Sequence, residues 1–294
     1  MSLSKFFASG RFGLSYELFP PKTDKGMSAL FSHLGDLMRF KPDFVTCTYG
    51  AGGSTQGKTL EICRRVKQEF NLPVASHLTV VGSTCEELNQ YLEDAKNSGV
   101  DHIVALRGDP PKGATEFKPV ERGLRYANEL VTLIRDSSFD FGVAVAGYPE
   151  THQECASPEL DLINLKRKVD AGADVVITQL FYNNNDYFNF VRQCEELEIS
   201  APIIPGILPV TDLGQIQRLA SMCGSKLPDE FIQQLAKEDN PEWQFEQGVN
   251  FAIKQVQELI DYGVPGLHFY VLNKSRATLK VLDSVTLPEN WHAV

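Results

Sequence analysis

The chain has 294 residues, of which 43% are hydrophobic and 22% charged, an ordinary composition for a globular protein with a sizeable core. Its net charge of -10 argues against nonspecific nucleic-acid binding, because such binding needs a basic surface. No run of about 18 apolar residues marks a membrane span, and the opening residues MSLSKFFASGRF lack the apolar run of a signal peptide. We therefore expect a cytoplasmic protein without a membrane partner.

Cysteine and histidine spacing gives no sign of a metal centre or a disulfide framework. The six histidines show no HExxH or similar spacing, and the cysteines form no CxxC pair. We expect no bound metal. The cysteines are Cys47, Cys63, Cys85, Cys155, Cys194 and Cys223.

Apolar segments rich in β-branched residues recur along the whole chain and predict eight strands. In chain order they cover 13–19, 43–48, 73–79, 101–107, 141–147, 174–179, 201–208 and 266–272. Segments of helical period lie between them, and the long connection 211–262 predicts extra helices before the last strand. This alternation predicts the α/β fold class, as a closed (β/α)8 TIM barrel that forms a single domain over residues 1–294.

The first predicted strand carries one acidic residue near its end. In the stretch RFGLSYELFPPK, the pair Pro20-Pro21 must stop the strand, so Glu17 lies at its carboxyl end. Taken alone, Glu17 could be a half-exposed rim residue or an ion-pair partner. In a barrel, however, the carboxyl ends of the strands build the active site, which makes Glu17 a candidate.

Polar side chains follow most of the other strands as well. Each has a structural alternative: a hydroxyl can bind loop backbone, a histidine can sit in the core, and Arg107 can pair with Asp109. Their convergence on one rim is the stronger signal, and it predicts a polar site with strand 201–208 as an apolar wall. The residues are Thr48, His77, Arg107, Gly108, Asp109, Tyr148, Gln179, Tyr270 and Lys274.

The loop TYGAGGST, residues 48–55, follows a strand and opens a helix, as the dinucleotide-binding GxGxxG loop does. The match is weak, because Thr55 replaces the third glycine and the next strand lacks the acid that would hold a ribose. We expect these glycines to let the backbone approach a ligand, without a Rossmann domain.

The predicted helix in 161–174 has a polar stripe beside its apolar one. Such stripes are often only solvated, but Lys166 and Asp170 already form a third face that can meet water. The polar stripe is then free to border the barrel mouth, where its acid, amide and cations would suit a ligand with hydroxyls and phosphates. It consists of Asp161, Asn164, Arg167 and Lys168.

Taken together, these motifs resemble the methylenetetrahydrofolate reductase family, in its short bacterial form. SYELFPPK, CTYGAGGST, ALRGDPP, AGYPETH, DLINLKRKVDAGAD and HFYVLNKS all occur in the family's order. The resemblance implies that NADH or NADPH reduces a noncovalent FAD, which then reduces 5,10-methylenetetrahydrofolate to 5-methyltetrahydrofolate in a ping-pong reaction of one-carbon metabolism and methionine biosynthesis. It also implies a homo-oligomer; the choice between NADH and NADPH stays open.

The resemblance also implies roles for individual residues. Glu17 is the expected general acid, with a pKa that burial must raise, and Asp109 the expected stabiliser of a cationic folate intermediate. Folate contacts are expected at Glu17, Asp109, Gln179, Tyr270 and Lys274, the last in place of a common arginine whose bidentate fork is lost. FAD contacts are expected at Thr48, His77, Arg107, Gly108, Asp109, Tyr126, Ala127, Tyr148, His152, Asp161, Asn164, Arg167 and Lys168.

Two other functions fit a barrel of this kind. An aldolase or phosphosugar enzyme would use a Schiff-base lysine or a glycine-rich loop after the seventh strand, but PGILPV is not glycine-rich. A noncatalytic flavin or folate carrier would keep the binding residues and have no need of Glu17.

Overall fold

The structure of the protein, a computed structural model, describes residues 2–8, 10–49, 56–110 and 117–291. The strands are β1 (Gly13–Leu18), β2 (Phe44–Cys47), β3 (Val74–Thr79), β4 (His102–Leu106), β5 (Gly142–Gly147), β6 (Val175–Thr178), β7 (Ile203–Ile204), β8 (Gly206–Ile207) and β9 (Gly266–Tyr270). The helices are η1 (Leu3–Phe7), α1 (Asp24–Leu37), η2 (Met38–Phe40), α2 (Gln56–Phe70), α3 (Cys85–Asn97), α4 (Ala127–Asp136), α5 (Pro158–Asp170), α6 (Asn184–Glu196), α7 (Leu213–Cys223), α8 (Asp229–Leu235), α9 (Pro241–Tyr262) and α10 (Arg276–Ser284).

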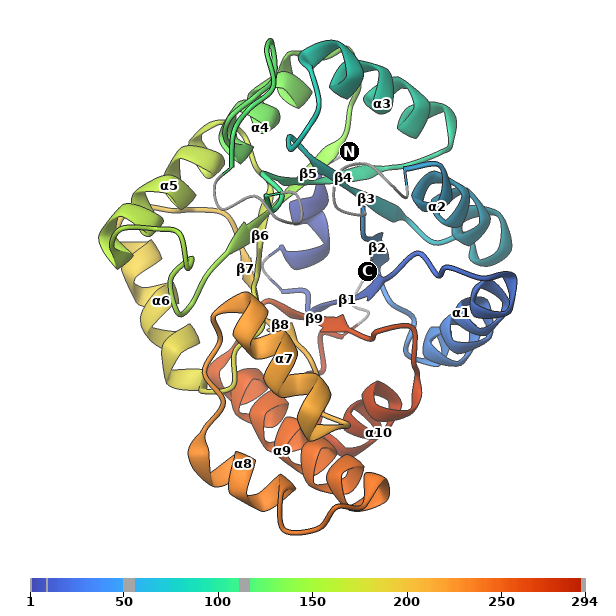
Figure 1. Cartoon of the computed structure of the whole chain (residues 1–294), viewed down its shortest axis with the longest axis vertical. Coiled ribbons are helices and arrows are strands. Elements are labelled where there is room, and N and C mark those ends of the chain that lie inside the picture. Colours follow the sequence, from blue (N-terminus) through green and yellow to red (C-terminus); the bar gives the residue numbers. More distant parts are fainter. Residues whose placement is uncertain (1, 9, 50–55, 111–116, 292–294) are drawn as a thin grey trace.

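The strands form one parallel sheet in the order β7-β6-β5-β4-β3-β2-β1-β9-β8, and helices surround it (Figure 1). Only Pro205 separates β7 from β8; β7 pairs with β6, and β8 pairs with β9. Since proline has no backbone N–H to donate, it splits the predicted seventh strand into two short pieces. Its carbonyl still accepts from His268 N at 3.1 Å, so the sheet closes. The predicted (β/α)8 TIM barrel is confirmed.

Side chains alternate between the two faces of the barrel wall, as the two-residue period of a strand requires. On β1, Leu14, Tyr16 and Leu18 point outward into the main core beneath the helices. Ser15 and Glu17 lie on the other face, inside the barrel, although all five side chains are buried. The barrel interior is therefore where this strand places its polar groups.

A short helix closes the amino-terminal end of the barrel, which the sequence did not lead us to expect. Leu3, Phe6 and Phe7 of η1 pack against side chains inside the ring, and Phe6 stacks on Phe44 with ring centroids 5.6 Å apart. In Figure 1 this helix, in dark blue, lies within the ring of strands. η1 thus forms a plug that fills the amino-terminal end of the barrel. The opposite end, where the strands have their carboxyl ends, is the open one.

The predicted extra helices before the last strand are confirmed as α7, α8 and the start of α9. They lie together, in orange, at one side of the ring in Figure 1. An apolar cluster that includes Leu208, Ile216, Phe231 and Leu235 holds them to the barrel. Even the 22-residue α9 lacks the sustained apolar character of a membrane span, and no other helix in the described part of the chain has it.

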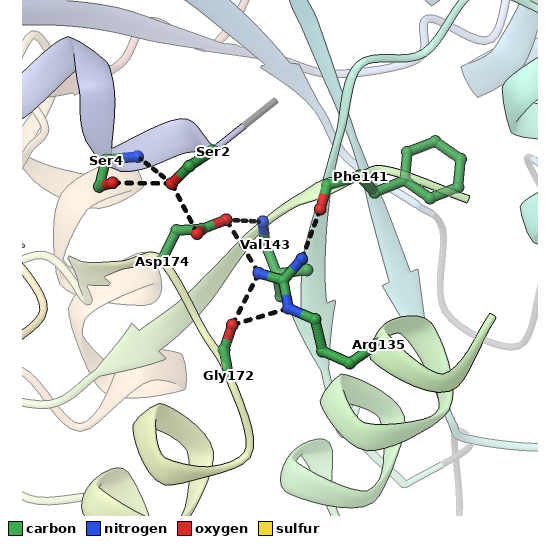
Figure 2. Close-up of polar contacts among 7 residues, drawn as sticks. All are labelled: Ser2, Ser4, Arg135, Phe141, Val143, Gly172 and Asp174. Atoms are coloured by element: carbon green, nitrogen blue, oxygen red, sulfur yellow. Dashed lines mark hydrogen bonds and ion pairs between the residues drawn. The ribbon is translucent and has the colours of Figure 1, made fainter. Parts of the chain in front are cut away.

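Arg135 at the end of α4 ties the loops below the barrel together (Figure 2). Its guanidinium donates to the carbonyls of Phe141 and Gly172 and to Asp174, whose carboxylate also accepts from Val143 N at 2.6 Å. Asp174 accepts from Ser2 as well, at 2.7 Å, which connects the plug segment to the same network. One planar cation thus joins α4 to the turns before β5 and β6.

We expect Arg135→Lys to lower the free energy of unfolding by about 1 to 2 kcal/mol, because an ammonium cannot reproduce the fork that reaches three partners at once. Thermal or urea unfolding measures the loss. Arg192→Lys is the matched control, since the Arg192 guanidinium donates to Asn189 on the exposed face of its own helix, at 3.0 Å. Equal stability of the two variants would contradict the role given to Arg135.

Candidate active site

A cavity of about 530 Å³ opens at the carboxyl ends of the strands, opposite the η1 plug. Predicted site residues from most of the strands meet there, although they are far apart in the sequence. The predicted residues that line it are Glu17, Thr48, His77, Arg107, Gly108, Asp109, Tyr148, His152, Gln179 and Tyr270.

Glu17 lies at the floor of this cavity, with only 7% of its surface exposed. Its Oε2 is 3.2 Å from His77 Nε2 and 3.7 Å from His268 Nε2. The strand register explains the meeting, because Glu17 pairs with Tyr270 on β9, two residues beyond His268 on the same face. His77 does not end its strand as predicted, since β3 continues to Thr79.

The expectation that burial raises the pKa of Glu17 is wrong. Burial does favour the neutral acid, but the neighbouring imidazoles of His77 and His268 outweigh it and lower the pKa of Glu17 to about 2. In the ligand-free protein Glu17 is therefore a carboxylate. Any proton it delivers must first come from a neighbouring group.

His268 is the functional candidate that the sequence analysis missed. It is fully buried, its Nδ1 lies 2.8 Å from Ser15 Oγ, and its Nε2 faces Glu17 without a hydrogen bond in the described chain. In the sequence it sits inside the apolar run GLHFYVL. Because side chains on a strand alternate, His268 lies on the same face of β9 as the predicted site residue Tyr270, two residues later. This two-residue spacing could have identified His268 from the sequence.

None of the four residues of the polar stripe on α5 lies in the cavity wall itself, but two of them bond to the backbone of residues that do. Asp161 Oδ2 accepts from His152 N at 3.0 Å, and Lys168 Nζ donates to Ala146 O, on β5, at 2.6 Å. Asn164 and Arg167 instead bond to each other at 2.9 Å. Lys166 and Asp170 form an ion pair of 3.2 Å on a separate face, where the sequence predicted them.

Lys168 is a cation that forms no ion pair with a carboxylate of the described residues. Burial lowers the pKa of its ammonium to about 8, although the charge of Asp161 acts in the opposite direction. Its ammonium also lies 5.8 Å from the ring of Tyr148, which lines the cavity. A half-buried ammonium held mainly by a carbonyl is well suited to receive an anion.

Gly108 and Asp109 follow β4 through a turn that only glycine can make. Gly108 has a φ of +86°, and a Cβ there would lie 2.7 Å from Val81 Cγ1. The turn carries the exposed Asp109 to the cavity wall. Beside it, Arg107 makes a two-point ion pair with Glu154, at 2.7 and 2.9 Å.

Three of the predicted folate contacts come from β6 and the end of the barrel. Gln179 Oε1 accepts from Leu180 N at 2.9 Å, and within the described part of the chain its amide N–H groups have no such bond and could serve a ligand. Tyr270 Oη donates to Thr178 O at 2.7 Å, so it is held across the ring. Lys274 is not in the cavity wall; it lies in the turn after β9, where its N donates to Val271 O at 2.8 Å.

Tyr126 and Ala127 also lie away from the cavity wall. Tyr126 is the residue before α4 and is 51% exposed, and Ala127 begins that helix. The predicted glycine-rich loop begins at Thr48 and Tyr49, both in the wall, but its residues 50–55 lie outside the described residues.

Part of the cavity wall comes from the helical insertion, which the sequence analysis did not assign to the site. Leu219 and Cys223 of α7 line the cavity, with Leu208 from the predicted apolar strand. Burial raises the pKa of Cys223 to about 11, so it is a neutral thiol at physiological pH. The cavity wall thus combines charged and apolar side chains, which suits a flat ring system with polar substituents.

Known proteins resemble this chain in sequence over nearly its whole length. The pattern of the family described as methylenetetrahydrofolate reductase matches residues 2–286. The chain is 39% identical over 277 residues to 5,10-methylenetetrahydrofolate reductase of Escherichia coli (strain K12), covering 94% of this chain and 91% of that protein. It is 38% identical over 289 residues to methylenetetrahydrofolate reductase (NADH) 1 of Arabidopsis thaliana. That match covers 95% of this chain but 49% of the plant protein, so the chain spans about half the length of this relative.

A solved structure agrees with the fold. A protein from Clostridium thermocellum that binds two copies of 5-methyl-5,6,7,8-tetrahydrofolic acid superposes with a TM-score of 0.63 at 14% identity. The superposition covers 95% of this chain and 96% of that one. The sequence matches, which extend across all the strands and the cavity residues, show that the chain belongs to the methylenetetrahydrofolate reductase family.

Proposed function

We propose that the barrel reduces 5,10-methylenetetrahydrofolate to 5-methyltetrahydrofolate with NADH or NADPH, through a noncovalent FAD, within a single domain. The observation that carries the proposal is the buried carboxylate of Glu17 beside His77 at the floor of the cavity. A binding protein has no need of a buried carboxylate in that place, whereas reduction of this folate needs a proton as well as a hydride.

Residues in the cavity wall, with Asp161 and Lys168 just behind it, fit FAD. Lys168 and Arg107 provide cations for phosphates, and Asp161 and Thr48 provide acceptors or donors for hydroxyls. Thr79 Oγ1 lines the same cavity and is buried without a hydrogen-bond partner in the described chain. When bound there, FAD would supply the hydride chemistry that side chains lack.

Glu17 and His77 would provide the proton as a pair. The 3.2 Å between Glu17 Oε2 and His77 Nε2 would let a proton pass between the two groups. Glu17 would pass this proton, directly or through a water, to the folate nitrogen that leaves when the five-membered ring opens. His268, bonded to Ser15, would hold the carboxylate in position.

Ring opening leaves a cationic iminium on the folate, and Asp109 would stabilise that charge from the cavity wall. Gln179 would bind the pterin through its free amide N–H groups, and Tyr270 would pack beside it. Lys274, from its turn after β9, would meet the negatively charged tail as a single charge without an arginine's fork.

The nicotinamide would bind against the same apolar side chains of the cavity wall as the folate. The name of the Arabidopsis thaliana relative specifies NADH, which supports NADH as the reductant in this chain too. A homo-oligomer and a cytoplasmic location stay predictions from the sequence.

We expect the purified protein to be yellow and to release FAD on denaturation, because the described site offers contacts for FAD but the sequence has no covalent attachment motif. A colourless protein that binds no added FAD would contradict the proposal as a whole, and binding of FAD without NADH oxidation would favour a carrier.

Steady-state rates with NADH and methylenetetrahydrofolate should give parallel double-reciprocal lines, since both substrates would share one face of the cavity. Intersecting lines would contradict the shared face.

A further inference from the structure

The cation at the mouth of the cavity is already engaged by an anion of the same chain. Arg107 Nη1 donates to Glu154 Oε2 at 2.7 Å, and Nη2 donates to Oε1 at 2.9 Å. The remaining edge is occupied too, because Nε donates to Gly108 O at 3.1 Å. The guanidinium therefore presents its bidentate face to Glu154, in the geometry that it would also offer to a phosphate.

Glu154 sits on the loop 148–157, which joins β5 to α5 and borders the cavity. Tyr148 and His152 of this loop line the cavity, and Glu154 N donates to His152 Nδ1 at 3.1 Å. The loop is anchored at other points, because Gln153 Nε2 donates to Met222 O at 2.9 Å and His152 N donates to Asp161. Glu154 can thus move by side-chain rotation while the loop backbone stays fixed.

Two properties make this ion pair easy to exchange. The Glu154 side chain is 47% exposed, so water can solvate its carboxylate when the pair opens. Hydrogen bonds from Arg107 lower the pKa of Glu154, so it is an anion at neutral pH and competes with other anions for the same two nitrogens. A buried partner would have made the exchange costly.

We propose that Glu154 is an internal latch on Arg107. The diphosphate of FAD must displace the Glu154 carboxylate from the Arg107 guanidinium before the cofactor can bind. The inference rests on the proposed function, because it takes FAD as the ligand of this cavity. Glu154 then sets the affinity and the association rate for the cofactor without touching the flavin or the folate.

The test measures FAD binding rather than turnover. Protein freed of FAD is mixed with FAD, and flavin fluorescence gives the dissociation constant and the association rate. Glu154→Gln should tighten binding by about twofold to fivefold, the strength of a partly exposed ion pair, mainly through faster association. Glu159→Gln removes the same charge from the exposed first turn of α5 and should leave both constants unchanged.

A double-mutant cycle separates the latch from simple charge repulsion. Arg107→Met should weaken FAD binding, and in that background Glu154→Gln should no longer have an effect, because there is nothing left to release. If Glu154→Gln tightens FAD binding equally in the native protein and in Arg107→Met, the latch is overturned. Glu154 would then act only as a negative charge that repels the phosphates.

Two further outcomes would also overturn the latch. Unchanged FAD binding in Glu154→Gln would mean that the pair is not broken by the cofactor. Weaker binding would mean that Glu154 positions Arg107 for FAD instead of competing with it. None of these results resembles failure of the proposed function, in which the unaltered protein would bind no FAD.

Discussion

Glu17→Gln should slow folate reduction by about 10² to 10⁴-fold while NADH still reduces the flavin at a nearly normal rate. Glutamine keeps the size of the side chain but cannot accept a proton from His77 and pass it on. Hydride transfer from NADH to FAD needs no such proton donor. Anaerobic stopped-flow absorbance follows flavin bleaching by NADH and its recovery on adding methylenetetrahydrofolate, so the two half-reactions can be timed separately.

Thr46→Val is the matched control for Glu17→Gln. Thr46 lies opposite Glu17 on β2, is fully buried, and has a hydroxyl without a hydrogen-bond partner in the described chain. The control should leave both half-reactions close to normal, since it changes the same layer of the barrel without touching the acid–base pair. Normal flavin recovery in Glu17→Gln would return the glutamate to a structural role.

Lys168→Met should change FAD affinity and protein stability in opposite directions. FAD binding should weaken by about 10-fold to 150-fold, which is the loss of one charge-assisted contact of about 1.5 to 3 kcal/mol. The FAD-free variant should nevertheless be more stable at neutral pH, by about 1 to 3 kcal/mol after allowing for the part of the side chain that water reaches. Fluorescence titration and urea unfolding measure the two effects.

The stability gain should depend on pH in a defined direction. The pKa of Lys168 is about 8 in the folded protein against 10.5 for an ordinary lysine. Below pH 8 the ammonium is charged in both states and its burial cost is fully present. Between these pKa values the unfolded chain holds more protons, so the native protein gains stability as pH rises, while the variant does not.

Urea unfolding of the FAD-free proteins at neutral pH and at about pH 9.5 should therefore show the difference between native and Lys168→Met shrinking. Lys166→Met is the matched control, since Lys166 lies on the same helix with its ammonium paired to Asp170 on the outer face. A variant less stable than the native protein at neutral pH would show that the Lys168 ammonium is not a burial cost.

The barrel could be predicted because its signals are local. Each strand lies in an apolar run, and several runs stop at a proline, a glycine or a charge within the same stretch, as Pro20-Pro21 shows for β1. The split of the seventh strand at Pro205 follows the same local rule, and the sequence analysis overlooked it. The η1 plug could not be predicted, because Leu3, Phe6 and Phe7 form no recognisable motif and gain their burial only inside the closed ring.

The site could be predicted in its members but not in its electrostatics. Position at a strand end brought Glu17, Arg107 and Tyr148 to one cavity, since all parallel strands end at one rim. The sign of the Glu17 pKa shift depends on His268, which is 251 residues away in the chain, and on the 3.2 Å contact with His77. Such distances are set by register and closure, which no stretch of sequence carries. The latch between Arg107 and Glu154 was out of reach for the same reason.

The most direct test of the account is a single turnover in the absence of NADH. The protein with FAD reduced by one equivalent of dithionite is mixed anaerobically with methylenetetrahydrofolate, and flavin absorbance is recorded while the folate product is quantified. We expect the oxidised flavin spectrum to return and an equal amount of 5-methyltetrahydrofolate to form. Flavin that stays reduced, or that reoxidises without forming 5-methyltetrahydrofolate, would contradict the proposed reaction.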